Sequence, residues 1–205
     1  MQEVLFLVFL SLTSVIAYDN CPKCGTMDVP YPLSTGDSCG NPSYRVYCNN
    51  GVLNFLSATG FYYKIQSIDP SASRLIISPP VILTNTCMSS DLSLGGLTID
   101  QNSPFNISSR NTVMLLNCSE GILLSPLNCS LSSPCRVFER GVGEGRGCGD
   151  TLCCSYLKDS SMTSHRIRAR VGGCSAYTSV VDLNPGDVNF HAWHYGIELQ
   201  WIPLT

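Results

Sequence analysis

The chain has 205 residues, of which 44% are hydrophobic and 13% are charged, and its formal net charge is −3. A negative chain without a long basic run argues against a nucleic-acid partner. The hydrophobic content is sufficient for a folded core, and the length suits one large domain or two small ones.

An uninterrupted apolar run opens the chain. Residues 4–12 read VLFLVFLSL, and Val15 and Ala17 place small side chains at positions −3 and −1 of a cleavage site before Tyr18. This pattern predicts a secretory signal peptide over residues 1–17 and a secreted, extracellular protein. The alternative is a short buried strand or helix of the mature fold. No other segment is expected to span a membrane.

Strand signals follow one another along the chain, whereas helical periodicity is hard to find. The residues Asn49–Gly51 predict a tight hairpin turn. Aromatic and β-branched segments bounded by Gly, Pro and Asn predict short strands over residues 44–47, 52–55, 61–68, 74–77, 112–116, 166–171 and 195–201. The expected fold is mainly β, with short strands, long loops and a glycine-rich loop over residues 141–149.

Twelve cysteines follow the predicted cleavage site. An even number in a secreted chain predicts a disulfide framework, whose connectivity the spacing leaves open. The pair Cys21-x-x-Cys24 would also suit a redox pair or half a zinc site, but the extracellular context favours structural disulfides. No metal site or cofactor is predicted. The predicted disulfide cysteines are Cys21, Cys24, Cys39, Cys48, Cys87, Cys118, Cys129, Cys135, Cys148, Cys153, Cys154 and Cys174.

A boundary near residue 125 divides these cysteines equally. It predicts a two-module extracellular domain, with a β module over residues 18–125 and a cysteine-rich module over residues 126–205. Three Asn-x-Ser sequons, at Asn106, Asn117 and Asn128, predict N-glycosylation on surface turns or strand edges.

The segment 21–48 carries a family resemblance. It has closely spaced cysteines before a glycine, then Tyr31-Pro32-Leu33, then Cys39-Gly40-Asn41-Pro42, and then Tyr44 before Cys48. This order resembles the galacturonan-binding domain of plant wall-associated receptor kinases, although Leu33 stands where the family usually has an aromatic residue. The elements Cys153-Cys154-Ser155, Gly173-Cys174 and 193–201 resemble the cysteine-rich region that follows in many members.

The resemblance implies a binding module for pectin and oligogalacturonides in the apoplast and cell wall. The chain would be attached to a membrane only as a fragment of a longer receptor. The alternative is a secreted receptor-like ectodomain that acts through contact with a wall-associated receptor kinase. No kinase or hydrolase motif is present, so an enzyme is not predicted.

Polygalacturonate requires cations at repeating intervals and flat faces for sugar rings. In a strand, Arg166, Arg168 and Arg170 would lie about 6.6 Å apart on one face, and guanidinium groups bind carboxylates through paired hydrogen bonds. The alternative is an ordinary solvated strand face. Arg45 and Lys64 would extend the cationic surface. Stacking faces would come from Tyr44 and Tyr62, with Tyr47, Tyr63, Trp193 and Trp201 as further aromatics, and the alternative for each ring is core packing.

Overall fold

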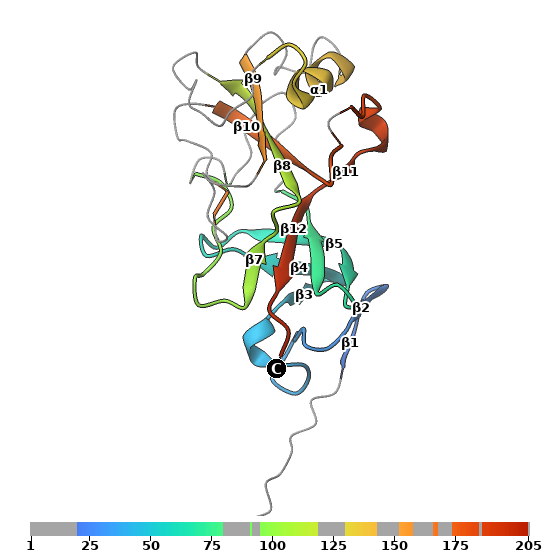
Figure 1. Cartoon of the computed structure of the whole chain (residues 1–205). Helices are drawn as coiled ribbons and strands as arrows, with labels where there is room; N and C mark the ends of the chain where they lie inside the picture. Colours follow the sequence, from blue (N-terminus) through green and yellow to red (C-terminus); the bar gives the residue numbers. More distant parts are fainter. Residues whose placement is uncertain are drawn as a thin grey trace, which may run out of the picture.

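The computed structural model describes residues 20–79, 91, 95–118, 130–142, 152–157, 166–167, 174–184 and 186–204. Strands predominate in these residues, which confirms the predicted mainly β fold. All the strand pairings are antiparallel, and within the described residues they form sheets of two, six and four strands (Figure 1).

The two-stranded sheet consists of β1 (Cys21–Cys24) and β2 (Met27–Val29). Two disulfides, Cys21–Cys39 and Cys24–Cys48, connect it to the loop before the short 3-10 helix η1 (Pro42–Tyr44) and to the strand that follows this helix. The two cysteines of the Cys-x-x-Cys element therefore bond to different partners, which confirms the structural role predicted for them. Cys135 and Cys174 are also disulfide-bonded.

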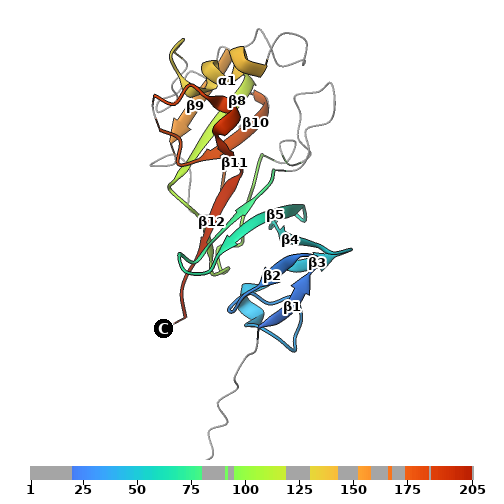
Figure 2. The same ribbon diagram turned by 90° about the vertical axis from the view of Figure 1, so that its right-hand side faces the viewer.

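The six-stranded sheet occupies the middle of the molecule (Figures 1 and 2). The turn at Asn50 and Gly51, both with positive φ, joins its first two strands as predicted. Alternation along its strands buries Tyr63, Ile65 and Phe55 on one face. In spatial order the strands are β3 (Tyr47–Asn49), β4 (Val52–Leu56), β5 (Tyr62–Asp69), β6 (Arg74–Ile77), β12 (Ile197–Trp201) and β7 (Phe105–Ile107).

The inner strands of the four-stranded sheet, β8 (Asn111–Cys118) and β10 (Cys174–Val181), carry buried side chains on both faces. Val113 and Leu115 of β8 belong to the large core that continues into the six-stranded sheet, whereas Met114 and Leu116 belong to a smaller core with Trp193. The helix α1 (Pro134–Val142), which the sequence did not predict, packs against β8 and β9. The strands in spatial order are β11 (His194–Tyr195), β10 (Cys174–Val181), β8 (Asn111–Cys118) and β9 (Leu152–Leu157), with the 3-10 helix η4 (Phe190–Ala192) before β11.

The chain crosses between the two larger sheets twice. After β7, residues 108–110 lead into β8, and after β11 the chain turns at Gly196 into β12. Gly196 has a φ of 148°, and a Cβ there would lie 2.4 Å from Cγ2 of Ile76. Glycine is therefore required where the chain changes sheets, and the single strand predicted over residues 195–201 is divided at this point.

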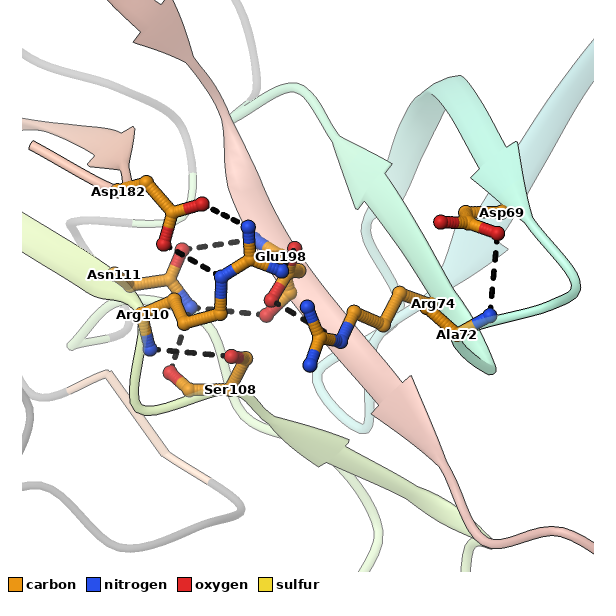
Figure 3. Close-up of polar contacts among 8 residues, drawn as sticks. All are labelled: Asp69, Ala72, Arg74, Ser108, Arg110, Asn111, Asp182 and Glu198. Atoms are coloured by element: carbon orange, nitrogen blue, oxygen red, sulfur yellow. Dashed lines mark hydrogen bonds and ion pairs between the residues drawn. The ribbon is translucent and has the colours of Figure 1, made fainter.

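Hydrogen bonds and ion pairs made by side chains connect the two segments in which the chain crosses between the sheets (Figure 3). The Asn111 side chain accepts a hydrogen bond from the Glu198 N–H at 2.8 Å and donates one to the Glu198 carbonyl at 2.9 Å. The Arg110 guanidinium pairs with Asp182 beyond β10 and with Oε2 of Glu198 at 3.0 Å. Because Glu198 is only 3% exposed, its buried charge needs compensation, which Arg110 supplies together with Arg74, whose Nε lies 3.9 Å from Oε1 of Glu198.

Strand pairing also joins the two sides of residue 125. β8 pairs with β9 and β10, and β12 lies between β6 and β7. Backbone hydrogen bonds within both larger sheets therefore connect the regions 18–125 and 126–205. The division of the chain into two modules near residue 125 stays a prediction.

Two other strand predictions have a different outcome. Residues 44–47 do not form one strand, because η1 ends at Tyr44 and β3 begins only at Tyr47. Of the strand predicted over residues 166–171, the structure describes only Arg166 and Ile167, and Arg166 forms an isolated bridge with Thr98.

Candidate functional site

The residues that carry the family resemblance are structural. Gly40 has a φ of 61°, and a Cβ there would lie 2.0 Å from the Leu33 carbonyl oxygen, so the loop requires glycine. The Asn41 side chain accepts a hydrogen bond from the Ser43 N–H at 3.0 Å and caps η1. Leu33 itself is fully buried. A ligand site therefore has to be sought among other residues of the segment.

The outer face of β3, β4 and β5 carries such residues. Tyr47 lies opposite Asn54, and Asn54 lies opposite Lys64, so the three side chains form a row across the sheet. Tyr62 lies on β5 two residues before Lys64, opposite Leu56, and its side chain is on the same face as that of Lys64. Its ring is 49% exposed, and Lys64 is exposed beside it. This face presents rings and a cation to solvent.

Arg45 extends this face beyond the start of β3. Its guanidinium carbon lies 6.0 Å from the centre of the Tyr47 ring, and the Tyr47 and Tyr62 rings meet edge to face at 5.6 Å. Arg45 also pairs with Asp37 at 3.1 Å, and the Asp37 side chain is 96% exposed. We call Arg45, Tyr47, Tyr62 and Lys64 the aromatic–cationic face.

A pocket of about 420 Å³ opens beside the aromatic–cationic face. Its polar lining includes Arg45, Tyr47, Asp100, Asn102 and Ser103, and its apolar lining includes Phe55 and Phe105. The volume lies within the range of roughly 300–1,000 Å³ that is usual for small-molecule sites. The pocket thus combines a cation, aromatic rings, a carboxylate and hydroxyl and amide groups.

The structure brings together only some of the residues predicted for the site. Arg45, Lys64 and Tyr62 share the aromatic–cationic face. The prediction for Tyr44 is wrong, because its ring is 4% exposed, its hydroxyl donates to the Ile202 carbonyl at 2.6 Å, and it packs on Phe105. Burial also raises the pKa of the Tyr44 hydroxyl, and the charge of Tyr31 contributes a smaller effect.

The predicted arginine row can be followed at one position. Arg166 is exposed, and the neighbouring Ile167 is fully buried, with its N–H bonded to the Leu97 carbonyl at 2.9 Å. Arg168 and Arg170 lie outside the described residues. Of the further aromatics, Tyr63, Trp193 and Trp201 are buried and pack in the cores.

The sequence reasoning missed Asp37, Asp100 and Asn102. Single polar residues in loops give no periodic signal, and only the fold places Asp100 in the same pocket as Arg45. Among the predicted glycosylation sites, Asn106 lies half-buried on the edge strand β7, whereas the side chains of Asn117 and Asn128 lie outside the described residues.

Neither a metal centre nor a membrane-spanning helix is found among the described residues. No group of three or more His, Cys, Asp or Glu side chains in them has an arrangement that would hold a metal ion. Their helices are too short or too polar to cross a membrane.

The chain is a disulfide-bonded, β-rich domain with aromatic rings and cations on an open sheet face, and these features are typical of ligand-binding domains. Residues 21–79 match the family described as wall-associated receptor kinase galacturonan-binding. The segment 21–79 carries the domain of this family, and it includes the whole aromatic–cationic face.

Two proteins of Arabidopsis thaliana are similar to most of the chain. Wall-associated receptor kinase-like 20 is 42% identical over 187 residues, which cover 88% of this chain and 28% of that protein. Wall-associated receptor kinase-like 15 is 41% identical over 186 residues, which cover 87% of this chain and 29% of that protein. The chain thus spans less than a third of the length of these relatives. No solved structure matches it at a significant level.

Proposed function

We propose that this chain binds acidic cell-wall polysaccharide of the polygalacturonan type through the aromatic–cationic face. The observation that carries the proposal is the combination, within the segment that matches the galacturonan-binding family, of Arg45, Tyr47, Tyr62 and Lys64 on one open surface. Sugar rings stack on aromatic faces, and guanidinium and ammonium groups pair with uronate carboxylates. These are the two chemistries that a chain of carboxylated pyranoses requires.

The arrangement favours oligomers over single sugars. Tyr47 and Lys64 are separated by two strand spacings, about 10 Å, so one pyranose ring does not reach both. An exposed ion pair contributes only about 0.2–1 kcal/mol. Useful affinity therefore requires several contacts along one polysaccharide chain, and each contact is weakened by salt.

Arg45 is available to such a ligand. Its partner Asp37 is almost fully exposed, so the existing ion pair belongs to the weak, solvent-screened kind. A uronate carboxylate in the pocket replaces Asp37, or shares the remaining guanidinium N–H groups with it.

The proposal includes the cellular setting. A wall polysaccharide ligand requires an extracellular location in the apoplast or cell wall, in agreement with the signal peptide predicted over residues 1–17. The disulfides Cys21–Cys39 and Cys24–Cys48 are of the kind that persists on the secretory route. Glycosylation at Asn106, Asn117 and Asn128 belongs to the same proposal.

Titration calorimetry with decagalacturonate tests the function. We expect binding that weakens between about 0.05 and 0.3 M salt, and little binding of monogalacturonate. Arg45→Glu and Lys64→Glu should each lower the affinity on the order of threefold to tenfold. The matched control is Arg140→Glu, because Arg140 is an exposed cation on α1 at the other end of the molecule (Figure 1).

Equal retention of mono- and decagalacturonate would contradict the proposal, as would equal effects of Arg45→Glu and Arg140→Glu. The triple change Arg166→Glu, Arg168→Glu and Arg170→Glu tests the predicted second cationic strip in the same assay. Absence of glycan binding together with co-purification of a receptor kinase would support the alternative function, a protein-interaction role.

A further inference from the structure

The pocket beside the aromatic–cationic face has a wall that lies outside the segment matched to the family. The matched segment ends at residue 79, but the pocket is also lined by Asp100, Asn102 and Ser103. Strands that are distant in sequence hold this wall in place. β7 begins at Phe105 and pairs with β12, which in turn pairs with β6 of the matched segment.

The wall is firmly anchored at both ends. Ile99 and Phe105 are 2% and 1% exposed, and the Phe105 ring packs edge to face on Phe55 at 5.4 Å. The Ala58 N–H donates to the Thr98 carbonyl at 2.8 Å, and this bond joins the wall to the loop after β4. The turn between the anchors is therefore positioned relative to Arg45 by packing and backbone hydrogen bonds.

The turn presents polar atoms to the pocket. Asp100 and Asn102 are exposed. Oδ1 of Asp100 accepts a hydrogen bond from the Asn102 N–H at 2.9 Å, and within the described residues its Oδ2 has no hydrogen-bond partner. A carboxylate oxygen in this position accepts hydrogen bonds from hydroxyl groups and repels a second carboxylate. The side-chain amide of Asn102 supplies donors and an acceptor beside it.

We propose that Asp100 and Asn102 form hydrogen bonds with the hydroxyl groups of the bound sugar and so select an acidic, hydroxylated polymer over other polyanions. The proposal rests on the proposed function, because it assigns the specificity of that same site. Arg45 and Lys64 alone attract any polyanion. The wall at residues 99–105 adds a requirement for hydroxyl donors in the same pocket as Arg45, and it disfavours polymers that place a further negative charge against Asp100.

Calorimetry on the full chain with two polymers of similar charge number, decagalacturonate and a polyglutamate, tests the selectivity. Asp100→Ala and Asn102→Ala should each weaken decagalacturonate binding about threefold to tenfold. Asp100→Ala should leave polyglutamate binding unchanged or strengthen it, so the affinity ratio falls. The dependence of decagalacturonate binding on salt should stay as in the unchanged protein, because no cationic contact is lost.

A second variant separates charge from turn geometry. Asp100→Asn keeps an oxygen that accepts from the Asn102 N–H, so the turn persists, but it removes the negative charge. It should relieve the repulsion of polyglutamate with a smaller loss of decagalacturonate binding. The control is Asp187→Ala, since Asp187 is exposed and makes the same local bond, to the Asn189 N–H at 2.9 Å, outside the pocket.

Different results would contradict the proposed function and the role proposed for Asp100 and Asn102. If the unchanged protein does not bind decagalacturonate, the proposed function is wrong and the assignment of Asp100 and Asn102 is wrong with it. If the unchanged protein binds, and the Asp100 and Asn102 variants keep both its affinity and its selectivity, the wall at residues 99–105 has no part in recognition and the proposed function stands.

Discussion

A buried carboxylate connects the two larger sheets at the level of single residues. Asp91 is fully buried and accepts hydrogen bonds from the hydroxyls of Tyr63 on β5 and Tyr177 on β10. Tyr63 belongs to the six-stranded sheet and Tyr177 to the four-stranded sheet. A buried polar group that loses its hydrogen-bond partner is costly, so these three side chains fix how the sheets face each other.

Loss of one of these hydroxyls should be costly. Tyr63→Phe leaves the Asp91 carboxylate with one fewer donor in a buried site, and we expect the free energy of unfolding to fall by about 1–3 kcal/mol. Urea denaturation measures the change. Tyr62→Phe is the control, because the Tyr62 ring is half exposed and its variant should stay within about 0.5 kcal/mol. Equal stabilities for the two variants would contradict this role of Asp91.

Tyr63 and Tyr177 should also make the fold less stable in alkaline solution. Burial raises the pKa of both hydroxyls above the ordinary value, with a further contribution from the charge of Asp91. The protonated forms are therefore favoured by folding. Their contribution is complete below the unfolded pKa near 10 and is lost as the pH rises above it toward the folded pKa.

Urea denaturation at about pH 8 and about pH 10.5 checks this pH dependence. The unchanged protein should lose more stability between the two conditions than a variant with both Tyr63→Phe and Tyr177→Phe. Parallel losses in the two proteins would assign the alkaline effect to other groups.

Residue-level predictions from the sequence succeeded where a strand pattern defined the face. The alternation in β5 exposes Tyr62 and Lys64 and buries Tyr63. No such pattern surrounds Tyr44, since it ends a 3-10 helix, and its burial depends on contacts with Phe105 and Ile202. The role of Asp91 was also beyond prediction, because its partners are 28 and 86 residues away in sequence.

At the scale of elements, the Asn111 side chain makes hydrogen bonds that a neighbouring strand would otherwise make. Its side-chain amide pairs with both backbone polar groups of Glu198, as a neighbouring strand would, and it also donates to the Ser108 carbonyl at 2.9 Å. Asn111 is fully buried. It therefore satisfies backbone groups near the start of β12, where the chain has just crossed from β11 in the other sheet.

Asn111→Ala should consequently be among the more damaging changes outside the aromatic core. The Glu198 N–H and the Ser108 carbonyl would lose the Asn111 amide as a partner, at about 1–3 kcal/mol for each unsatisfied group, whereas the Glu198 carbonyl would keep its bond from the Ser108 N–H. We expect the free energy of unfolding to fall by at least about 2 kcal/mol, measured by urea denaturation. The control is Asn54→Ala, since the Asn54 side chain makes only an exposed bond to the Val52 carbonyl. A loss no larger than that of the control would show that water replaces the Asn111 amide.

The prediction of elements from sequence depended on their length and periodicity. Strands β4, β5, β6 and β8 lie close to the predicted ranges, because alternating or continuous apolar residues mark them. The helix α1 has nine residues in a cysteine-rich stretch, which is too short for a helical period to stand out. The division at Gly196 was hidden because apolar and aromatic residues continue on both sides of it.

For the whole molecule, disulfides supplement cores that are already well formed. Cys24 and Cys48 are joined across 24 residues, and Cys21 and Cys39 across 18. Cys21, Cys24 and Cys39 also pack in the large core with Leu33. The disulfides thus connect the two-stranded sheet to a core that strands of the six-stranded sheet build.

Removal of one disulfide should weaken the fold without abolishing it. The double change Cys24→Ser and Cys48→Ser should lower the free energy of unfolding by about 2–4 kcal/mol, as measured by urea denaturation under non-reducing conditions. The pair Cys21→Ser and Cys39→Ser should give a similar or slightly smaller loss, because its loop is shorter. A chain that is unfolded in water after either change would mean that the apolar cores alone are insufficient.

The class of the whole molecule was predictable, but its site was predictable only in part. The cysteine pattern and the short strands indicated a disulfide-bonded β domain. The exposure of Lys64 and Tyr62 on one strand face could be predicted from the alternation in β5. The place of Asp100 and Asn102 could not, since β7 and β12 bring them to Arg45 through pairings between distant parts of the sequence. Such long-range pairings leave no local pattern in the sequence.

The position of β12 has a consequence for how the protein is made. This strand is an inner member of the six-stranded sheet, yet it leaves the ribosome after every other strand of that sheet. Until then β6 has an unpaired edge, and β7 lacks its neighbour. We therefore expect the nascent chain to close the disulfides of residues 21–48 early and to depend on chaperones, since an exposed apolar edge promotes aggregation.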